Sequence, residues 1–127
     1  MKKVKMMARI LVVDDDEIMR TLLRKFLESD GHQVDEALDG EQAVRCYREN
    51  SFDIVITDIF MPEQDGFELI MELKMSFPKI KIIAISGGGQ KLDKRLALRV
   101  TKMLGTVQQL EKPFTQEQIL EAVHRLL

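Results

Sequence analysis

The chain has 127 residues, of which 45% are hydrophobic and 31% charged, so it suits one compact, soluble domain and excludes a multidomain enzyme or a wholly disordered chain. Its formal net charge of -2 argues against nucleic-acid binding driven by bulk charge, and its single cysteine, Cys46, excludes an internal disulfide and favours a reducing cytoplasm. The first apolar run ends before Asp14, and this run is too short to be a signal peptide or a membrane span. We therefore expect a cytoplasmic protein without membrane insertion.

The chain begins with an apolar run, residues 8–13, that predicts a buried strand. The run is β-branched and lacks polar alternation, which is typical of a parallel strand buried on both faces. Segment 16–29 follows and predicts a helix, because its apolar residues recur at helical spacing. These residues are Ile18, Met19, Leu22, Leu23, Phe26 and Leu27. Asp30 and Gly31 then supply a stop signal for the helix.

The same alternation continues to the end of the chain and gives five strand–helix units. The predicted strands are 8–13, 33–36, 52–57, 80–85 and 106–110. The predicted helices are 16–29, 40–49, 65–76, 92–104 and a last one that Thr115 caps. Five such units indicate an open, doubly wound α/β fold with a parallel sheet, in one domain over 1–127. Ligands of such sheets bind outside the carboxyl ends of the strands, so functional residues should follow the strands.

Polar side chains gather at those strand ends. They are Asp14, Asp15, Asp16 and Glu17 after the first strand, Asp58 after the third, Ser86 after the fourth and Lys112 after the fifth. Carboxylates about 4 Å apart repel by roughly 4 kcal/mol per pair at an effective dielectric constant of about 20, so the cluster should recruit a cation. Mg²⁺ is the natural choice, because it commonly takes one or two carboxylates plus a phosphate oxygen.

These residue types also suit phosphoryl chemistry. An aspartate such as Asp58 can act as a nucleophile and form an aspartyl phosphate, a step that mainly requires neutralised charge and alignment. The ammonium of Lys112 and the hydroxyl of Ser86 can each contact a phosphoryl oxygen. Zinc is not expected, because His32 and His124 lie near opposite ends of the chain.

Four ordered motifs carry a family resemblance. They are residues 11–17 (LVVDDDE), 53–66 (DIVITDIFMPEQDG), 82–87 (IIAISG) and 110–114 (LEKPF). These motifs resemble those of receiver domains of bacterial two-component response regulators, and the similarity covers essentially the whole chain. It implies a flavodoxin-like, five-stranded parallel sheet with strand order 2-1-3-4-5 and five helices.

The resemblance also implies roles for individual residues. Asp58 would accept a phosphoryl group from a sensor histidine kinase or a phosphotransfer protein. The groups that would hold Mg²⁺ are Asp14, Asp15, Asp58 and the backbone carbonyl of Phe60. Ser86 occupies the hydroxyl switch position of the family, and Lys112 occupies the position of its lysine, which precedes a peptide bond that is usually cis.

By this resemblance the chain is a phosphorylation-dependent switch and not an enzyme, although it would assist its own phosphorylation and dephosphorylation. Phosphorylation would change its affinity for a downstream protein or output domain, without direct binding to nucleic acid. The chain could act alone or belong to a longer regulator. One departure concerns the switch itself, because Gln109 stands where many receivers carry an aromatic side chain.

Two other functions compete with this interpretation. The run from Asp14 to Ile18 is also similar to the first motif of haloacid-dehalogenase-type phosphatases, but those enzymes carry a further acidic motif after their lysine. Here only Glu117 and Glu121 follow Lys112, both on a predicted helix, and Asp58 would have no role. A phosphorylation-independent interaction module is the other alternative. Gln109 favours it, and the complete set of Asp58, Ser86 and Lys112 argues against it.

Overall fold

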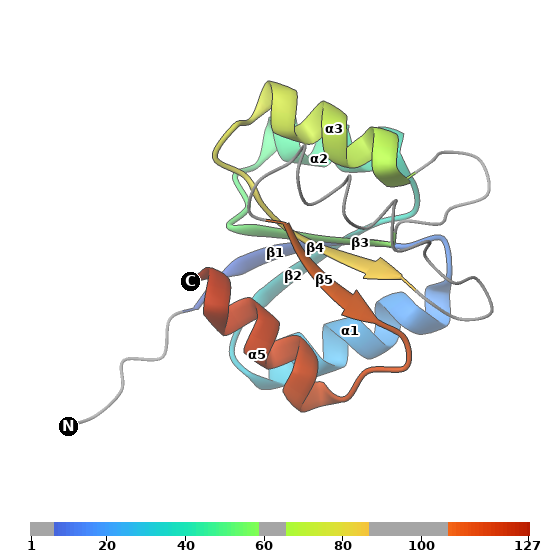
Figure 1. Ribbon diagram of the computed structural model, residues 1–127, viewed down its shortest axis with the longest axis vertical. Helices are drawn as coiled ribbons and strands as arrows, with labels where there is room; N and C mark the ends of the chain where they lie inside the picture. Colours follow the sequence, from blue (N-terminus) through green and yellow to red (C-terminus); the bar gives the residue numbers. More distant parts are fainter. Residues whose placement is uncertain (1–6, 59–65, 87–106) are drawn as a thin grey trace.

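The computed structural model describes residues 7–58, 66–86 and 107–127, and these build a five-stranded parallel sheet with helices on both faces (Figure 1). The strands are β1 (Arg9–Val13), β2 (Gln33–Ala37), β3 (Ile54–Asp58), β4 (Lys81–Ser86) and β5 (Val107–Glu111). The helices are α1 (Glu17–Ser29), α2 (Gly40–Glu49), α3 (Gly66–Ser76) and α5 (Gln116–Leu126). The strand order β2-β1-β3-β4-β5 confirms the predicted topology. The helix expected at 92–104 lies outside the described residues.

The predicted boundaries differ from these by at most two residues. The largest shift is in β3, which begins at Ile54 and ends at Asp58 instead of spanning 52–57. Such shifts are normal at element ends, where pairing frays. The shift at the carboxyl end has a consequence for the site, because Asp58 is itself the last residue of the strand.

Two apolar layers hold the helices against the sheet. Figure 1 shows α1 and α5 on one face and α2 and α3 on the other. In β1, Ile10 and Val12 pack in the layer beneath α1 and α5, while Leu11 and Val13 pack in the layer beneath α2 and α3. Because successive strand residues point to opposite faces, a strand buried on both faces is mostly apolar, as the run at 10–13 is.

The buried face of α1 differs from the one expected. Leu23 and Leu27 are buried as predicted, but Ile18 is 79% exposed and Leu22 lies at the surface. The third buried residue of the helix is a charged one, Arg20. This helix therefore has more apolar residues than the sheet covers. Helical spacing alone did not show which of these residues face the sheet.

Side chains cap the ends of α1 and α5. The carboxylate of Asp16 accepts a hydrogen bond from the backbone N–H of Ile18 at 2.9 Å and so caps α1. Gly31, after the end of the same helix, has a φ of +88°, a left-handed conformation that favours glycine. Thr115 and Gln118 form a reciprocal capping box at the start of α5. These observations confirm the predicted helix stop at Asp30 and Gly31 and the predicted cap at Thr115.

The peptide bond between Lys112 and Pro113, which lies between β5 and α5, is cis, as the family resemblance implies. Among the helices that the structure describes, none combines the length and apolar character needed to cross a membrane.

Candidate functional site

Three carboxylates meet at the carboxyl ends of β1 and β3. Asp14 and Asp15 directly follow β1, and Asp58 is the last residue of β3, the strand that pairs with β1. One carboxylate oxygen from each of the three lies within 4.8 Å of those of the other two. Asp14 and Asp58 are buried, whereas Asp15 is exposed. The cluster therefore has a buried floor and an open side.

A lysine from the far edge of the sheet reaches into this cluster. Lys112 follows β5, and its ammonium nitrogen lies 3.1 Å from Oδ2 of Asp58 and 3.8 Å from Oδ2 of Asp14. The shorter contact is a charge-assisted hydrogen bond, while the longer one is a Coulombic contact only. Only 20% of the lysine side chain is exposed, so its charge acts at close range with little screening by solvent.

The surroundings of the Asp14 carboxylate disfavour its charged form. Its Oδ1 accepts a hydrogen bond from the backbone N–H of Asp16 at 2.9 Å. Within the part of the chain that the structure describes, no hydrogen-bond donor reaches its buried Oδ2. Burial raises the pKa of Asp14 to about 6; the Asp16 N–H and Lys112 oppose this rise, and the charges of Asp58 and Asp15 add to it.

The donor set at this site suits a hard divalent cation. Three carboxylates offer only oxygen ligands, and Lys112, the one lysine that contacts them among the described residues, does not balance their charge. A buried carboxylate oxygen without a donor, such as Oδ2 of Asp14, is costly unless a proton or a cation compensates it. Mg²⁺ prefers this chemistry, with one or two carboxylates and the remaining positions filled by water or phosphate oxygens. The residues present therefore fit Mg²⁺.

The structure brings together four of the six predicted site residues: Asp14, Asp15, Asp58 and Lys112. Ser86 ends β4 beside the end of β5, where it pairs with Glu111, but its side chain lies outside what the structure describes. Phe60 also lies outside the described residues. The roles assigned to all six remain predictions.

Arg20 is a residue of this region that sequence reasoning missed. Its Nη1 donates a hydrogen bond to the backbone carbonyl of Asp14 at 2.6 Å, and its Nε donates to Glu36 on β2 at 3.2 Å. A signal for its burial was present, because Arg20 shares a helical face with Leu23 and Leu27. A charge on the apolar face of a helix indicates a buried partner.

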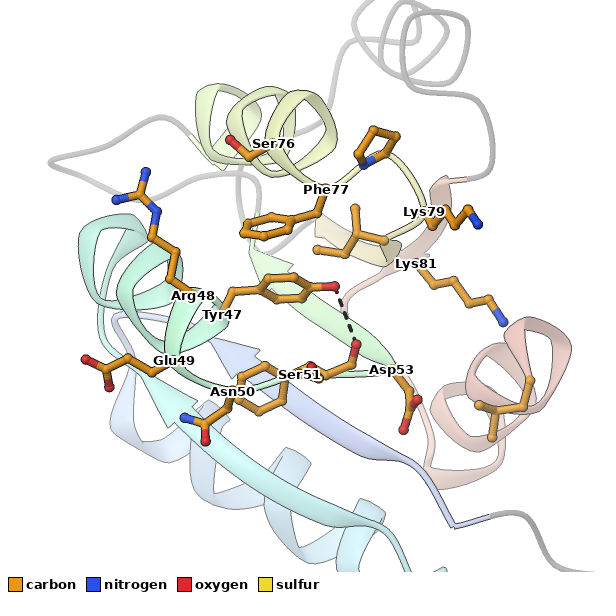
Figure 2. Close-up of a pocket in the computed structure, with 14 residues that line it drawn as sticks. Tyr47, Arg48, Glu49, Asn50, Ser51, Asp53, Ser76, Phe77, Lys79 and Lys81 are labelled. Atoms are coloured by element: carbon orange, nitrogen blue, oxygen red, sulfur yellow. Dashed lines mark hydrogen bonds between the residues drawn. The ribbon is translucent and has the colours of Figure 1, made fainter.

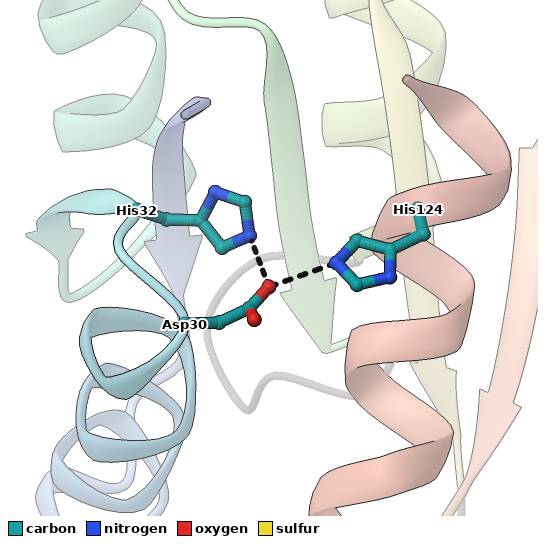
Figure 3. A group of neighbouring side chains, drawn as sticks. All are labelled: Asp30, His32 and His124. Atoms are coloured by element: carbon teal, nitrogen blue, oxygen red, sulfur yellow. Dashed lines mark hydrogen bonds and ion pairs between the residues drawn. The ribbon is translucent and has the colours of Figure 1, made fainter. Parts of the chain in front are cut away.

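A second polar cluster lies away from this site. His32 and His124, which are far apart in the sequence, both donate from Nε2 to the same oxygen of Asp30, at 2.9 and 2.8 Å (Figure 3). The Nδ1 of His32 accepts the N–H of Ala8 at 3.0 Å, so the ring proton must sit on Nε2. A metal ion at Nε2 would have to displace that proton and break the bond to Ala8, so the cluster is better suited to hydrogen bonding.

A groove of about 830 Å³ lies at the opposite end of the sheet from the carboxylates. Residues that precede β3 and β4 line it, and Figure 2 shows the rings of Tyr47 and Phe77 beside each other within it. Their centroids are 4.3 Å apart, and the hydroxyl of Tyr47 donates to the carbonyl of Phe52 at 3.5 Å. Cys46 is half-buried and packs against the apolar layer beneath α2 and α3. No ionisable cluster of the kind found at Asp58 lines this groove among the described residues.

The fold and the carboxylate cluster agree with comparison to known proteins. The sequence pattern described as the response regulator receiver domain matches residues 10–124. The chain belongs to this family. Receiver domains of this family are signalling domains of two-component systems, generally bind Mg²⁺ in an acidic pocket, and interact with histidine kinases and downstream targets.

Individual receiver proteins match over nearly the whole chain. The chemotaxis protein CheY of Bacillus subtilis is 38% identical over 120 residues, which cover 94% of this chain and 97% of that protein. The structure of chemotaxis protein CheY4 of Vibrio cholerae is 29% identical, with a TM-score of 0.83 over 96% of this chain and all of that one. The response regulator TrrA of Thermotoga maritima, solved in complex with Mg²⁺ and BeF, is 30% identical, with a TM-score of 0.80 over 95% of this chain and all of TrrA. The flavodoxin-like fold is therefore shared with CheY-type receivers.

Proposed function

We propose that this receiver domain is a phosphorylation-dependent switch in which Asp58 accepts a phosphoryl group. The donor would be a sensor histidine kinase or a phosphotransfer protein. The observation that carries the proposal is the 3.1 Å contact between Lys112 and Asp58 inside a cluster of three carboxylates. An ammonium at this distance can neutralise charge on a phosphoryl group attached to Asp58. The whole chain, 1–127, would act as one such domain in the cytoplasm.

The transfer step can be written with the groups at this site. A carboxylate oxygen of Asp58 attacks phosphorus, a new oxygen–phosphorus bond forms, and the phosphorus–nitrogen bond of the donor histidine breaks. The leaving imidazole takes up a proton from solvent. Asp58 sits at the end of a buried strand, so its carboxylate is held in place and the approach of the donor is confined to the open side of the cluster.

The remaining acids would hold Mg²⁺ beside Asp58. The proposed ligands are Asp14, Asp15, Asp58 and the backbone carbonyl of Phe60, and the orphaned Oδ2 of Asp14 supports this assignment. The TrrA structure, which contains Mg²⁺ and BeF, supports Mg²⁺ binding by a domain of this fold. When bound, Mg²⁺ supplies positive charge that offsets the charge of the carboxylates and of the phosphoryl oxygens.

Ser86 and Lys112 would couple phosphorylation of Asp58 to a structural change elsewhere in the domain. We propose that the Ser86 hydroxyl binds one phosphoryl oxygen while Lys112 binds another, and that this engagement shifts the surface formed by the fourth helix, expected at 92–104, by β5 and by α5. The shift would change affinity for a downstream protein or output domain. Attack of water on phosphorus would later release phosphate and restore the carboxylate of Asp58, so that the domain would limit the lifetime of its own signal.

Intact-protein mass spectrometry after incubation with acetyl phosphate tests the proposal. We expect one phosphoryl adduct on the wild type that requires Mg²⁺ and is absent in Asp58→Asn. The matched control is Asp53→Asn, because Asp53 lies just before the other end of β3 and its Oδ2 accepts the N–H of Arg9, an interaction that asparagine can keep. Asp53→Asn should form the same adduct as the wild type.

Other outcomes would point to the competing functions. An adduct that persists in Asp58→Asn would overturn the assignment of the phosphoacceptor. Hydrolysis of acetyl phosphate that survives Asp58→Asn but needs Asp14 would indicate a phosphatase. If neither an adduct nor binding of BeF in the presence of Mg²⁺ is found, the chain is a phosphorylation-independent interaction module.

A further inference from the structure

Arg20 connects α1 to the point at which the chain leaves β1. Its guanidinium lies almost wholly inside the protein, with 10% of the side chain exposed. Nη1 donates to the carbonyl of Asp14 at 2.6 Å, and Nε donates to Oε1 of Glu36 at 3.2 Å. A charged donor at 2.6 Å from a buried carbonyl makes one of the stronger hydrogen bonds available to a backbone group.

The Asp14 carbonyl belongs to the peptide unit that joins the two neighbouring acids of the site. Because a peptide unit is planar, a hydrogen bond that fixes the carbonyl of Asp14 also fixes the N–H of Asp15 and the direction in which Asp15 leaves the strand. On the other side of Asp14, its own N–H donates to the carbonyl of Ala37 at 3.2 Å. Asp14 is therefore held by the sheet on one side and by Arg20 on the other.

Glu36 holds the guanidinium in this position. It lies on β2, and its second oxygen, Oε2, accepts a hydrogen bond from Nε of Arg24 at 2.8 Å. Arg24 also bonds to Glu28 at 3.2 Å, within the same helix. Two arginines of α1 thus share one glutamate. Among the described contacts, only Arg20 also donates a hydrogen bond to a residue of the acidic site, through the Asp14 carbonyl.

We propose that Arg20 is a positioning residue for the acidic cluster. It presets the peptide between Asp14 and Asp15 so that both carboxylates face Asp58, and it thereby sets the affinity of the site for Mg²⁺. This inference rests on the proposed function, because it assumes that these carboxylates bind Mg²⁺. Residues that orient metal ligands without touching the metal typically change metal affinity by about 10- to 100-fold when they are replaced.

Calorimetric titration of the metal-free protein with Mg²⁺ tests the proposal. Arg20→Met removes the guanidinium, and Arg24→Met is the matched control because Arg24 shares Glu36 but not the Asp14 carbonyl. We expect the dissociation constant for Mg²⁺ to rise about 10-fold in Arg20→Met and to stay within about twofold of wild type in Arg24→Met. In metal-free protein, the backbone amide resonances of Asp15 and Asp16 should shift in the first variant and not in the second.

Two further comparisons separate positioning from general stabilisation. Each titration is made at a temperature where circular dichroism shows a folded variant. Arg20→Lys keeps a cation and a donor, so it covers the case in which Arg20→Met does not fold, and its Mg²⁺ affinity should fall several-fold while that of Arg24→Lys does not. Wild-type Mg²⁺ affinity in folded Arg20 variants would overturn the positioning role and leave the proposed function intact. Absence of Mg²⁺ binding by the wild type would overturn both.

Discussion

The ammonium nitrogen of Lys112 lies 3.1 Å from Oδ2 of Asp58, although 54 residues separate them in the sequence. The contact crosses β4, because Asp58 ends β3 while Lys112 follows β5. It gives three clustered carboxylates a cation that belongs to the protein itself. The metal-free protein should therefore depend on this lysine for its stability.

Replacing Lys112 by Met should lower the free energy of unfolding of the metal-free protein by about 2 kcal/mol at pH 7.5. This is less than the 3 to 5 kcal/mol typical of breaking a fully buried pair, since the site is open on one side. Urea denaturation with a chelator measures the loss. Added Mg²⁺ should recover more stability in Lys112→Met than in wild type, because the variant has more uncompensated charge. The exposed Lys79 provides the control, as Lys79→Met should change neither quantity appreciably.

Asp14 should destabilise the metal-free protein at neutral pH. Burial raises its pKa from 3.8 to about 6, so between these values the folded protein binds a proton that the unfolded chain has lost. By linkage, stability then falls as pH rises from about 4 to 6, and the full penalty remains above pH 6. A shift of this size corresponds to at most about 3 kcal/mol.

Asp14→Asn removes this penalty and keeps an oxygen that can accept the N–H of Asp16. We expect the variant to be more stable than wild type by about 1 to 3 kcal/mol at pH 7.5, with the difference vanishing near pH 4. Urea denaturation across this range, with a chelator present, measures it. Glu72→Gln, a loss of one charge on the exposed side of α3, should show no such pH dependence. A stability gain that is the same at pH 4 and pH 7.5 would contradict the buried charge of Asp14 as its cause.

Sequence reasoning placed the acids and Lys112 close together because their proximity follows from topology. Once Asp14, Asp58 and Lys112 are placed at or after the carboxyl ends of parallel strands, the common direction of those strands brings all three to the same end of the sheet. The bond from Arg20 to the Asp14 carbonyl could not be predicted in this way, because a backbone acceptor has no residue signature. The bond between His124 and Asp30 depends on how α5 packs against α1, which strand order does not determine.

The capping box of α5 offers a test of how that helix is held. Thr115 accepts the N–H of Gln118 at 3.1 Å, and the Gln118 side chain accepts the N–H of Thr115 at 2.9 Å. Thr115→Ala removes the hydroxyl and should cost about 1 kcal/mol of unfolding free energy, because it leaves a helix N–H without its partner. Thermal and urea denaturation measure the loss, and Thr115→Ser should retain most of the stability. Equal losses in the two variants would argue against the cap.

Asp30 joins the C-terminal helix to the turn after α1, and its protonation should loosen that junction. Burial by itself would raise the pKa of Asp30, but the hydrogen bonds from His124 and His32 outweigh it and lower the pKa below 3.8. A lowered carboxyl pKa contributes stability that is present above the unfolded value and is lost as pH falls through the folded one. The contribution should therefore persist at pH 6 and disappear in acid below about pH 4.

His124→Ala should make this contribution measurable. At pH 6 we expect the variant to be less stable than wild type by about 1 to 2 kcal/mol, toward the lower end of the values for hydrogen bonds to charged groups because the His124 side chain is largely exposed. This difference in stability should become smaller below about pH 4. The matched control is Arg125→Ala on the same helix, since Arg125 pairs only with Glu121 one turn away among the described contacts and is exposed. Urea denaturation from pH 3 to pH 7 distinguishes the two variants. If the difference in stability between His124→Ala and wild type stayed constant over that range, His124 would not be what lowers the pKa of Asp30.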